Sequence, residues 1–371
     1  MKKSNIENLI IQSPYSLNKD EKEELFLSSL KESFLHHYNN NRLFKNFCLN
    51  SSFTVDNIDT DLSKFPYFPV NLFKRKNLIS IEESEIKGIL NSSATSGIPS
   101  SITIDKLTSK RQSIVSSRVM SDYLGNHRRH FMILDIDPLK SRSIEISARA
   151  AASRGFLNLA SSYDYLLEEG PEGLTLNLES FISSVEYRIE RNEELCFFGF
   201  TYVLYHSVIK NLLANDITFK LPAGSKIAHI GGWKKLESQR VSKAKFLKDV
   251  SKVFGISKEN IFDFYGFTEQ MGLVYVSQGD SPKVIPAYSH LIVRDFQTLE
   301  PVPDGEEGLL QFITPIPHSY PGVSILTEDV GRIIERGTDE YGRHGVQFEI
   351  IGRAKDAEVR GCGDIMSNYI A

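Results

Sequence analysis

Residues 226–266 read KIAHIGGWKKLESQRVSKAKFLKDVSKVFGISKENIFDFYG and hold two short apolar stretches on either side of a helix-like segment. The stretches KIAHIGG (226–232) and IFDFYG (261–266) have the length of strands, and each ends at glycine. The segment 234–253 lies between them, and one of its faces, continued to residue 254, is apolar: Val241, Phe246, Val250 and Phe254. A strand, a helix and a second strand in this order predict a β-α-β unit with parallel strands.

The same alternation extends toward the N-terminus. FMILDI (131–136) and LCFFGF (195–200) are strand-like, and 106–124 has a helical pattern. After residue 270 the pattern changes to hairpin-like pieces such as HLIVRD and GLLQFIT, which are separated by the turn PVPDGEEG. The sequence therefore predicts an α/β core followed by a mixed or antiparallel β section.

The first part of the chain predicts a helix and an extended arm. Residues 18–38 place apolar side chains at helical spacing behind Asn18, a favourable helix cap. Residues 59–71 contain Pro66 and Pro69, which prevent a regular helix, so we expect this segment to run extended across the next unit.

Composition excludes several classes of function. The 371 residues carry 43 Lys+Arg against 47 Asp+Glu, a formal charge of -4, which gives no general attraction to nucleic acid or anionic lipid. The most apolar stretch, 196–209, is shorter than the ~20 residues that span a bilayer, and Leu9–Ile11 is too short for a signal peptide. The three cysteines are far apart in the sequence and odd in number, which does not favour a disulfide-bonded framework. We expect a cytoplasmic protein that does not enter the membrane.

A hydroxyl-rich turn, SSATSGIPSS (92–101), precedes the helical pattern that starts near Lys106. Backbone amides and hydroxyls of such a turn are suited to hold phosphate oxygens, and a solvated linker is the alternative interpretation. The residues predicted to bind phosphate are Ser92, Ser93, Thr95, Ser96 and Gly97.

A second segment, YGFTE, follows the apolar stretch that starts at Ile261. Tyr265 and Gly266 offer a stacking face for a base, Thr268 offers a hydroxyl, and Glu269 offers a carboxylate suited to Mg²⁺. A strand end with a capping threonine and an exposed glutamate is the alternative interpretation.

Three further positions follow predicted strands or turns. Gly231 and Gly232 permit close approach of a ligand to the backbone, although twin glycines also form ordinary turns. Asp329 and Arg353 are suited to hold ribose hydroxyls, and each is also an ordinary salt-bridge candidate.

These segments, in this order, resemble the motifs of the adenylate-forming enzymes. SATSGIPS resembles the phosphate signature SGTTGxPK of that superfamily, and YGFTE resembles its adenine and magnesium motif. Asp329 and Arg353 fall where its ribose-binding aspartate and its hinge sequence are expected. The resemblance implies the core fold of that superfamily, with ATP and Mg²⁺ as cofactors and Thr268 and Glu269 as catalytic residues.

The most specific resemblance is to the acyl-protein synthetase subunit of the fatty acid reductase complex of luminous bacteria. It rests on SFLHHY, FPVNLFK, GGWKK, TLEPVPDGEEGL, SYP and the C-terminal RGCG, and it covers nearly the whole chain. It implies that a carboxylic acid, a fatty acid in that family, is activated as an acyl-adenylate and passed to a cysteine. Cys362 occupies the place of that cysteine, and an acyl reductase is the implied partner.

The resemblance also implies a division of the chain and exposes departures. We expect an N-terminal arm over 1–85, the adenylate-forming core over 86–352, and a hinge stub with a cysteine-bearing tail over 353–371 in place of a full C-terminal lid domain. The lid domain of the superfamily carries a catalytic lysine, and Lys355, Arg360 or a partner subunit would substitute for it, or adenylation would be slow. Ala94 and Ser100 replace a glycine and a lysine of the phosphate signature.

Two alternatives remain open at this stage. An acyl-CoA or aryl-CoA ligase of the phenylacetate type would use free CoA and leave Cys362 without a role. A non-catalytic scaffold subunit would have no need of the nucleotide motifs.

Overall fold

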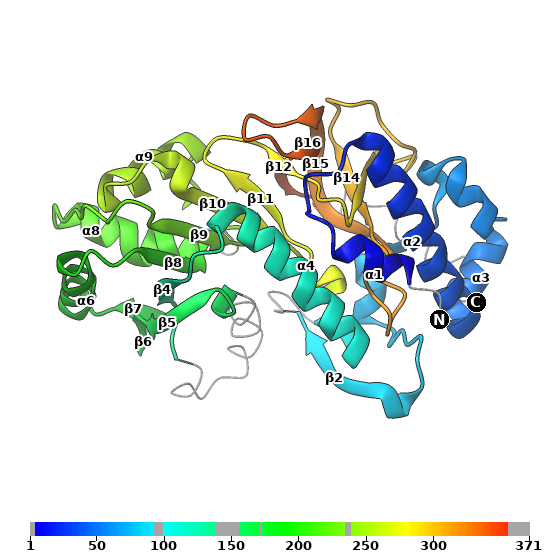
Figure 1. The fold of residues 1–371 in the computed structure, drawn as a ribbon, viewed down its shortest axis with the longest axis horizontal. Coiled ribbons are helices and arrows are strands. Elements are labelled where there is room, and N and C mark those ends of the chain that lie inside the picture. Colours follow the sequence, from blue (N-terminus) through cyan, green and yellow to red (C-terminus); the bar gives the residue numbers. More distant parts are fainter. Residues whose placement is uncertain (1–3, 93–98, 138–155, 171–172, 234–238, 355–371) are drawn as a thin grey trace. The chain divides into compact units, whose positions relative to one another are not determined.

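The computed structural model describes residues 4–92, 99–137, 156–170, 173–233 and 239–354 (Figure 1). The chain divides into two compact units, each of which is described by itself. Unit 1 takes residues 1–118, 267–275 and 282–371, and unit 2 takes residues 119–266 and 276–281. Within the described residues, no helix is both long enough and apolar enough to cross a membrane.

Unit 2 is built on five parallel strands. Their order is β10 (Ile261–Tyr265), β9 (Lys226–Ile230), β8 (Leu195–Phe200), β4 (Arg129–Leu134) and β5 (Ala160–Tyr165). Every neighbouring pair in this series is parallel. The parallel strands and the β-α-β unit predicted from residues 226–266 are confirmed, and each strand is almost continuously buried, as expected for a sheet covered by helices, except for the edge strand β5.

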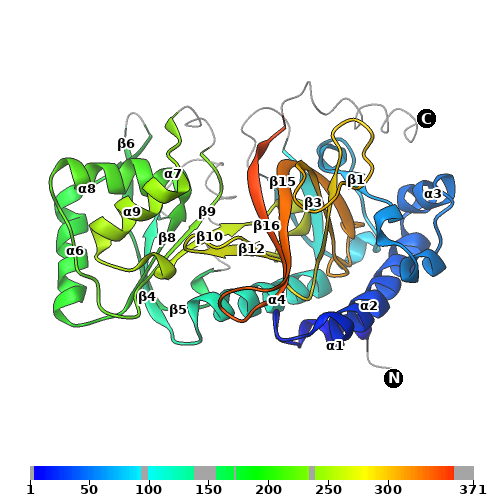
Figure 2. The same cartoon turned by 90° about the horizontal axis from the view of Figure 1, so that it is seen from above.

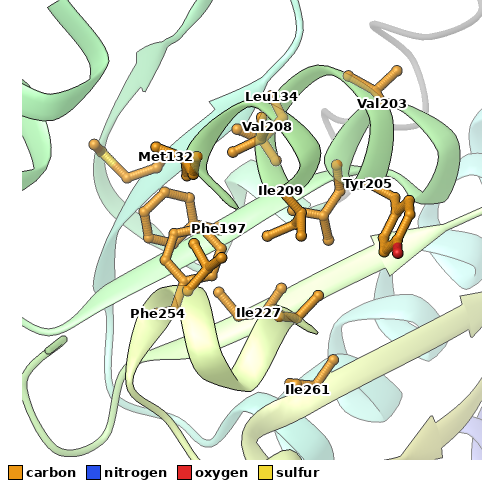
Figure 3. Packing of buried hydrophobic residues seen from close by; sticks show 14 of the residues in the cluster. Met132, Leu134, Phe197, Val203, Tyr205, Val208, Ile209, Ile227, Phe254 and Ile261 are labelled. Carbon is orange, nitrogen blue, oxygen red and sulfur yellow. The ribbon is translucent and has the colours of Figure 1, made fainter. Parts of the chain in front are cut away.

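Helices pack on this sheet around a large apolar cluster (Figure 3). The cluster takes side chains from α6 (Leu178–Glu190), from α9 (Lys243–Phe254) and from one helical stretch formed by α7 (Thr201–Val203), η5 (Leu204–Ile209) and α8 (Lys210–Ala214). The rings of Phe197 and Phe254 lie 4.5 Å apart between sheet and helix. The smaller elements of unit 2 are β6 (Leu167–Gly170), β7 (Gly173–Leu176) and η7 (Lys258–Asn260).

The helix predicted over 234–253 is shorter than expected. It begins at Lys243 because the Ser242 side chain caps it by accepting a hydrogen bond from the Lys245 backbone N–H. It ends at Phe254, where Gly255 adopts a left-handed conformation.

Unit 1 contains the antiparallel β section expected after residue 270. Strands β13 (His290–Arg294), β14 (Gly308–Ile313), β15 (Ser324–Thr338), β16 (His344–Arg353) and β12 (Lys283–Val284) are neighbours in that order. All four pairings are antiparallel, and Figure 2 shows β15 and β16 side by side. Strand β11 (Tyr275–Gln278) carries the boundary between the two units.

The N-terminal elements also belong to unit 1. They are α1 (Asn5–Ile10), α2 (Lys19–Asn40) and α3 (Arg42–Asn50). Asn18 closes a capping box with Glu21 at the start of α2, which confirms the predicted helix and its cap. The proline-rich arm contains β1 (Phe68–Pro69), which pairs in parallel with β15.

A hairpin and a long helix complete unit 1. Strands β2 (Ile86–Asn91) and β3 (Ser101–Asp105) pair in antiparallel fashion, and α4 (Lys106–Leu124) follows at once, as predicted, and runs into unit 2. Short 3₁₀ turns make up the rest: η1 (Val55–Asp59), η2 (Leu62–Lys64), η3 (Val70–Lys74), η4 (Glu83–Glu85) and η8 (Thr268–Gln270).

Candidate active site

Two of the predicted binding segments meet at one edge of the sheet in unit 2. Ile230 of β9 pairs with Phe264 of β10 in parallel register, so Gly231 and Tyr265 follow neighbouring strand ends. Gly231 has a positive φ of 78°, and no heavy atom lies within 4 Å of a Cβ placed on Gly232. The carboxyl ends of parallel strands are where ligands bind in such sheets. The fold therefore brings Gly231, Gly232, Tyr265 and Gly266 to a suitable edge, whereas Thr268 and Glu269 belong to unit 1.

A polar cluster that we did not predict lies at the same edge. The Thr201 hydroxyl is 2.9 Å from His229 Nδ1 and donates a hydrogen bond to the Gly231 carbonyl oxygen at 2.5 Å. The Asp263 carboxylate lies 3.7 Å from His229 Nδ1. Thr201 thereby fixes the backbone of the glycine turn. The sequence signal for this cluster was a histidine between the apolar residues Ala228 and Ile230 of β9.

In unit 1, the turn η8 holds Glu269 in the interior. Its neighbour Gln270 donates hydrogen bonds to the carbonyl oxygens of Phe312 and Gly322, at 3.0 and 2.9 Å. Gly322 packs so closely that a Cβ there would lie 2.8 Å from the Glu269 carbonyl oxygen. Sequence reasoning singled out neither Gln270 nor Gly322, because both act through contacts more than forty residues away.

Glu269 is 3% exposed, so it is not the exposed glutamate of the alternative interpretation. Burial raises the pKa of its carboxyl above the ordinary value, while the Ser100 hydroxyl and the cations Lys74 and Arg353 act in the opposite direction. A bound cation would stabilise the ionised form of a carboxylate that is buried in this way. Mg²⁺ is commonly held by one or two carboxylates together with substrate phosphates. Glu269 therefore fits a magnesium ligand.

The base of the hydroxyl-rich turn lies next to Glu269. Ser92 and Ser100 bond to each other twice, through Ser92 N–H to Ser100 O at 2.9 Å and through Ser100 N–H to Ser92 Oγ at 2.8 Å. These bonds continue the antiparallel pairing of β2 and β3 by one residue on each side. The Ser100 side chain forms a hydrogen bond with the Glu269 carboxylate. Ser100 and Glu269 are therefore neighbours in unit 1. The other predicted phosphate ligands, Ser93, Thr95, Ser96 and Gly97, lie outside the described residues.

Asp329 and Arg353 face each other across neighbouring strands. They are paired residues of β15 and β16. Arg353 Nη2 donates to Glu328 Oε2 at 2.6 Å, and the Asp329 N–H donates to the Thr327 hydroxyl at 3.2 Å. The Arg353 side chain is 60% exposed. The two residues predicted to hold a ribose therefore lie together in unit 1, which also contains Glu269.

A buried hydrogen-bond network supports the Ser319–Gly322 segment that packs against Glu269. The Thr108 hydroxyl accepts from the backbone N–H groups of His318 and Ser319, at 3.1 and 3.0 Å. Asp105 caps α4 through the Thr108 N–H at 2.7 Å and bonds to His318 Nδ1 at 2.8 Å. Burial alone would raise the pKa of Asp105, but the bonds from His318 and Thr108 outweigh it and hold that pKa well below its ordinary value.

Two cysteines are poor nucleophiles in this fold. Cys48 and Cys196 are 0% and 1% exposed, and burial raises the pKa of each thiol to about 12. The interpretation of Cys196 as a small buried residue is confirmed. Cys362 lies outside the described residues. Within the part of the chain that the structure describes, no group of three or more His, Cys, Asp or Glu side chains is arranged to hold a metal ion.

Comparison with known proteins assigns the family. The family model described as "Acyl-protein synthetase, LuxE" matches residues 1–371. The chain belongs to this family. The assignment confirms the resemblance drawn from TLEPVPDGEEGL and RGCG, and with it an ATP-dependent ligase that activates an acid as an adenylate and transfers the acyl group to a thiol.

Curated relatives match over nearly their whole length. A long-chain-fatty-acid–luciferin-component ligase of Aliivibrio fischeri is 28% identical over 99% of this chain and 94% of its own. The ligase of the same name from Vibrio harveyi is 25% identical over 98% of this chain and 93% of its own.

Solved structures support the fold. A 2-hydroxyisobutyryl-CoA ligase in an open conformation, in complex with 2-HIB-AMP and CoA, matches with a TM-score of 0.66 at 15% identity, over 92% of this chain and 77% of its own. The chain therefore has the fold of the adenylate-forming ligases, as the sequence motifs implied.

Proposed function

We propose that this acyl-protein synthetase uses ATP and Mg²⁺ to activate a fatty acid and then loads the acyl group on Cys362. The observation that carries the proposal is the buried Glu269 beside Ser100, at the base of the hydroxyl-rich turn. A buried carboxylate beside a segment rich in hydroxyls supports the proposal, because a cation and phosphate groups would then bind side by side. The fatty acid is taken from the names of the curated relatives.

The first step is formation of the mixed anhydride. A carboxylate oxygen of the acid attacks the α-phosphorus of ATP, the bond to the β-phosphate oxygen breaks, and pyrophosphate leaves. Bound through Glu269, Mg²⁺ would offset the negative charge that develops on the phosphates. The turn from Ser92 to Gly97 would hold phosphate oxygens, and Thr268 would donate its hydroxyl to one of them.

The residues predicted to bind the nucleoside would have separate roles. Tyr265, Gly266, Gly231 and Gly232 at the strand ends of unit 2 would contact adenine. Asp329 would accept hydrogen bonds from the ribose hydroxyls, with Arg353 beside it as an exposed cation.

The second step is transfer to the thiol. The Cys362 thiolate attacks the acyl carbonyl carbon, the bond to AMP breaks, and AMP leaves with the electron pair. Cys362 is the candidate because Cys48 and Cys196 are buried with raised thiol pKa values. Residues 353–371 would act as a hinge stub and tail that presents this cysteine, and Lys355 or Arg360 would supply the positive charge that a lid lysine provides in the superfamily.

The loaded thioester needs an acceptor. An acyl reductase subunit is the partner that we propose, because a thioester is a suitable form in which to hand an acyl group to a reductase. We also propose a cytoplasmic location, where the Cys362 thiol would stay reduced.

Exchange of labelled pyrophosphate into ATP, measured across a panel of carboxylic acids, tests the activation step. We expect exchange that depends on the acid and on Mg²⁺ and is fastest with long-chain acids. If none of the acids in the panel supports pyrophosphate exchange, the proposal is refuted. Turnover that requires free CoA and leaves the protein unlabelled would instead favour the CoA-ligase alternative.

A further inference from the structure

A cavity of about 380 Å³ lies in unit 1 between α2, α3 and the turn that follows α3. Its walls are almost entirely apolar, and the side chains that define it include Phe34, Tyr38, Cys48, Leu49, Phe53 and Val55. None of them belongs to the nucleotide motifs or to the proposed activation step. Its volume falls within the ~300–1,000 Å³ of typical small-molecule sites.

The chain is folded back to form this cavity. Ser52 adopts a positive φ of 52°, which is uncommon for a residue other than glycine. The reversal lets the Phe53 N–H donate to the Cys48 carbonyl oxygen at 2.9 Å, and η1, which starts at Val55, then contacts α2. The rings of Phe34 and Phe53 then lie 5.8 Å apart as one wall. The cavity is therefore shaped by the backbone as well as by side chains.

Exposed apolar side chains line the cavity, and a cation that is not itself a lining residue lies next to Tyr38. Leu35 and Leu49, which both line the cavity, are 44% and 57% exposed. Lys45, one turn before Leu49 on α3, places its ammonium 5.3 Å from the centre of the Tyr38 ring. Among the described residues, Lys45 has no carboxylate partner. An open apolar cavity with a positive charge beside one of its lining residues complements a molecule with an apolar chain and one negative end.

We infer that this cavity is a second binding site for an aliphatic carboxylic acid, with the chain between α2 and α3 and the carboxylate at Lys45. This site is separate from the site at which the acid is activated, since neither Glu269 nor Asp329 lines the cavity. The lining residue Cys48 would not take up the acyl group of an acid held here, because burial raises the pKa of its thiol to about 12. The site therefore stores or senses the acid and does not react with it.

Equilibrium dialysis with radiolabelled tetradecanoic acid tests the inference, on the full chain saturated with a non-hydrolysable acyl-adenylate analogue. The analogue fills the activation site, so acid bound in addition reports a second site. We expect one further equivalent of acid. Lys45→Glu and Leu49→Glu should each weaken it at least tenfold, because both place a negative charge at or beside the cavity. Both positions are exposed, so the variants should fold.

Two controls make the result specific. Lys252→Glu makes the same charge change at an exposed site on α9 and should leave binding of the second equivalent unchanged. Tetradecanol, which has the chain without the carboxylate, should compete poorly. Binding of no second equivalent, or a second equivalent that Lys45→Glu and Leu49→Glu both leave intact, would overturn the inference. Pyrophosphate exchange in the same preparations reports separately on the proposed function, so the failure of one is distinguishable from the failure of the other.

Discussion

Replacing Glu269 by glutamine removes one negative charge from a side chain that is 3% exposed, with almost no change in its shape. The carboxyl pKa is raised in the folded protein, so its ionised form opposes folding at neutral pH when no cation is bound. A carboxyl with a raised folded pKa adds stability below its unfolded value, near 4.3, and loses this advantage as the pH rises. Glu269→Gln should therefore raise the melting temperature of the nucleotide-free protein at pH 7.

The same change should impair activation. A metal ligand that offsets charge on a reacting phosphate is worth several kcal/mol. Because each 1.36 kcal/mol corresponds to a tenfold change in rate, we expect pyrophosphate exchange to fall by at least about 10²-fold. Raising the Mg²⁺ concentration should restore part of the activity if the loss is one of metal affinity.

Thermal melting and pyrophosphate exchange on the same preparations form the assay. Glu335→Gln, an exposed carboxylate on β15 of the same unit, is the matched control and should change neither quantity. A Glu269→Gln protein that melts at a higher temperature and exchanges at the wild-type rate would remove Glu269 from the metal site. A protein that melts at a lower temperature would refute the reasoning about its buried charge.

Three further predictions follow from the same contacts. Asp329→Ala should raise the apparent KM for ATP at least tenfold, because two charge-assisted hydrogen bonds to ribose are worth about 1.5–3 kcal/mol each; an unchanged KM in steady-state kinetics would show that Asp329 does not bind ribose. Asp105→Asn should lower the free energy of unfolding by about 1.5–3 kcal/mol above pH 4, and the difference should shrink as the pH falls from there toward the lowered folded pKa of Asp105; urea unfolding that gives a difference independent of pH from 7 to 3 would contradict this. Cys48 and Cys196 should resist iodoacetamide at pH 8 in the native protein, because burial raises their thiol pKa values to about 12; rapid labelling of either, mapped by mass spectrometry, would argue against their burial.

The strands of unit 2 could be predicted because their signal is local. The run at residues 195–200 is apolar throughout and became β8 with the same bounds, as expected for a strand covered on both faces. The start of α9 was missed because helical spacing alone does not reveal a cap. The Ser242 side chain sets the start of α9 by accepting a hydrogen bond from the Lys245 N–H, which depends on the extended backbone of Ser242.

Sequence motifs name the candidate site residues, but they do not name the residues that position them in the fold. YGFTE identified Glu269, yet its position depends on Gln270 reaching two carbonyl groups that lie 42 and 52 residues away. The bond of Asp105 to His318 spans 213 residues, and only the folded chain brings them together. The cavity beside α3 depends in the same way on the conformation of a single residue, Ser52.

Mapping of the acyl label on the protein tests the central claim most directly. Wild-type protein incubated with ATP, Mg²⁺ and a long-chain fatty acid should gain one acyl mass, and peptide analysis should place it on Cys362. Cys362→Ser should lose the label while it continues to exchange pyrophosphate, because the adenylate forms before the thiol is needed. A label on Cys48 or Cys196, or an unlabelled wild-type protein that forms a thioester only with free CoA, would contradict the account.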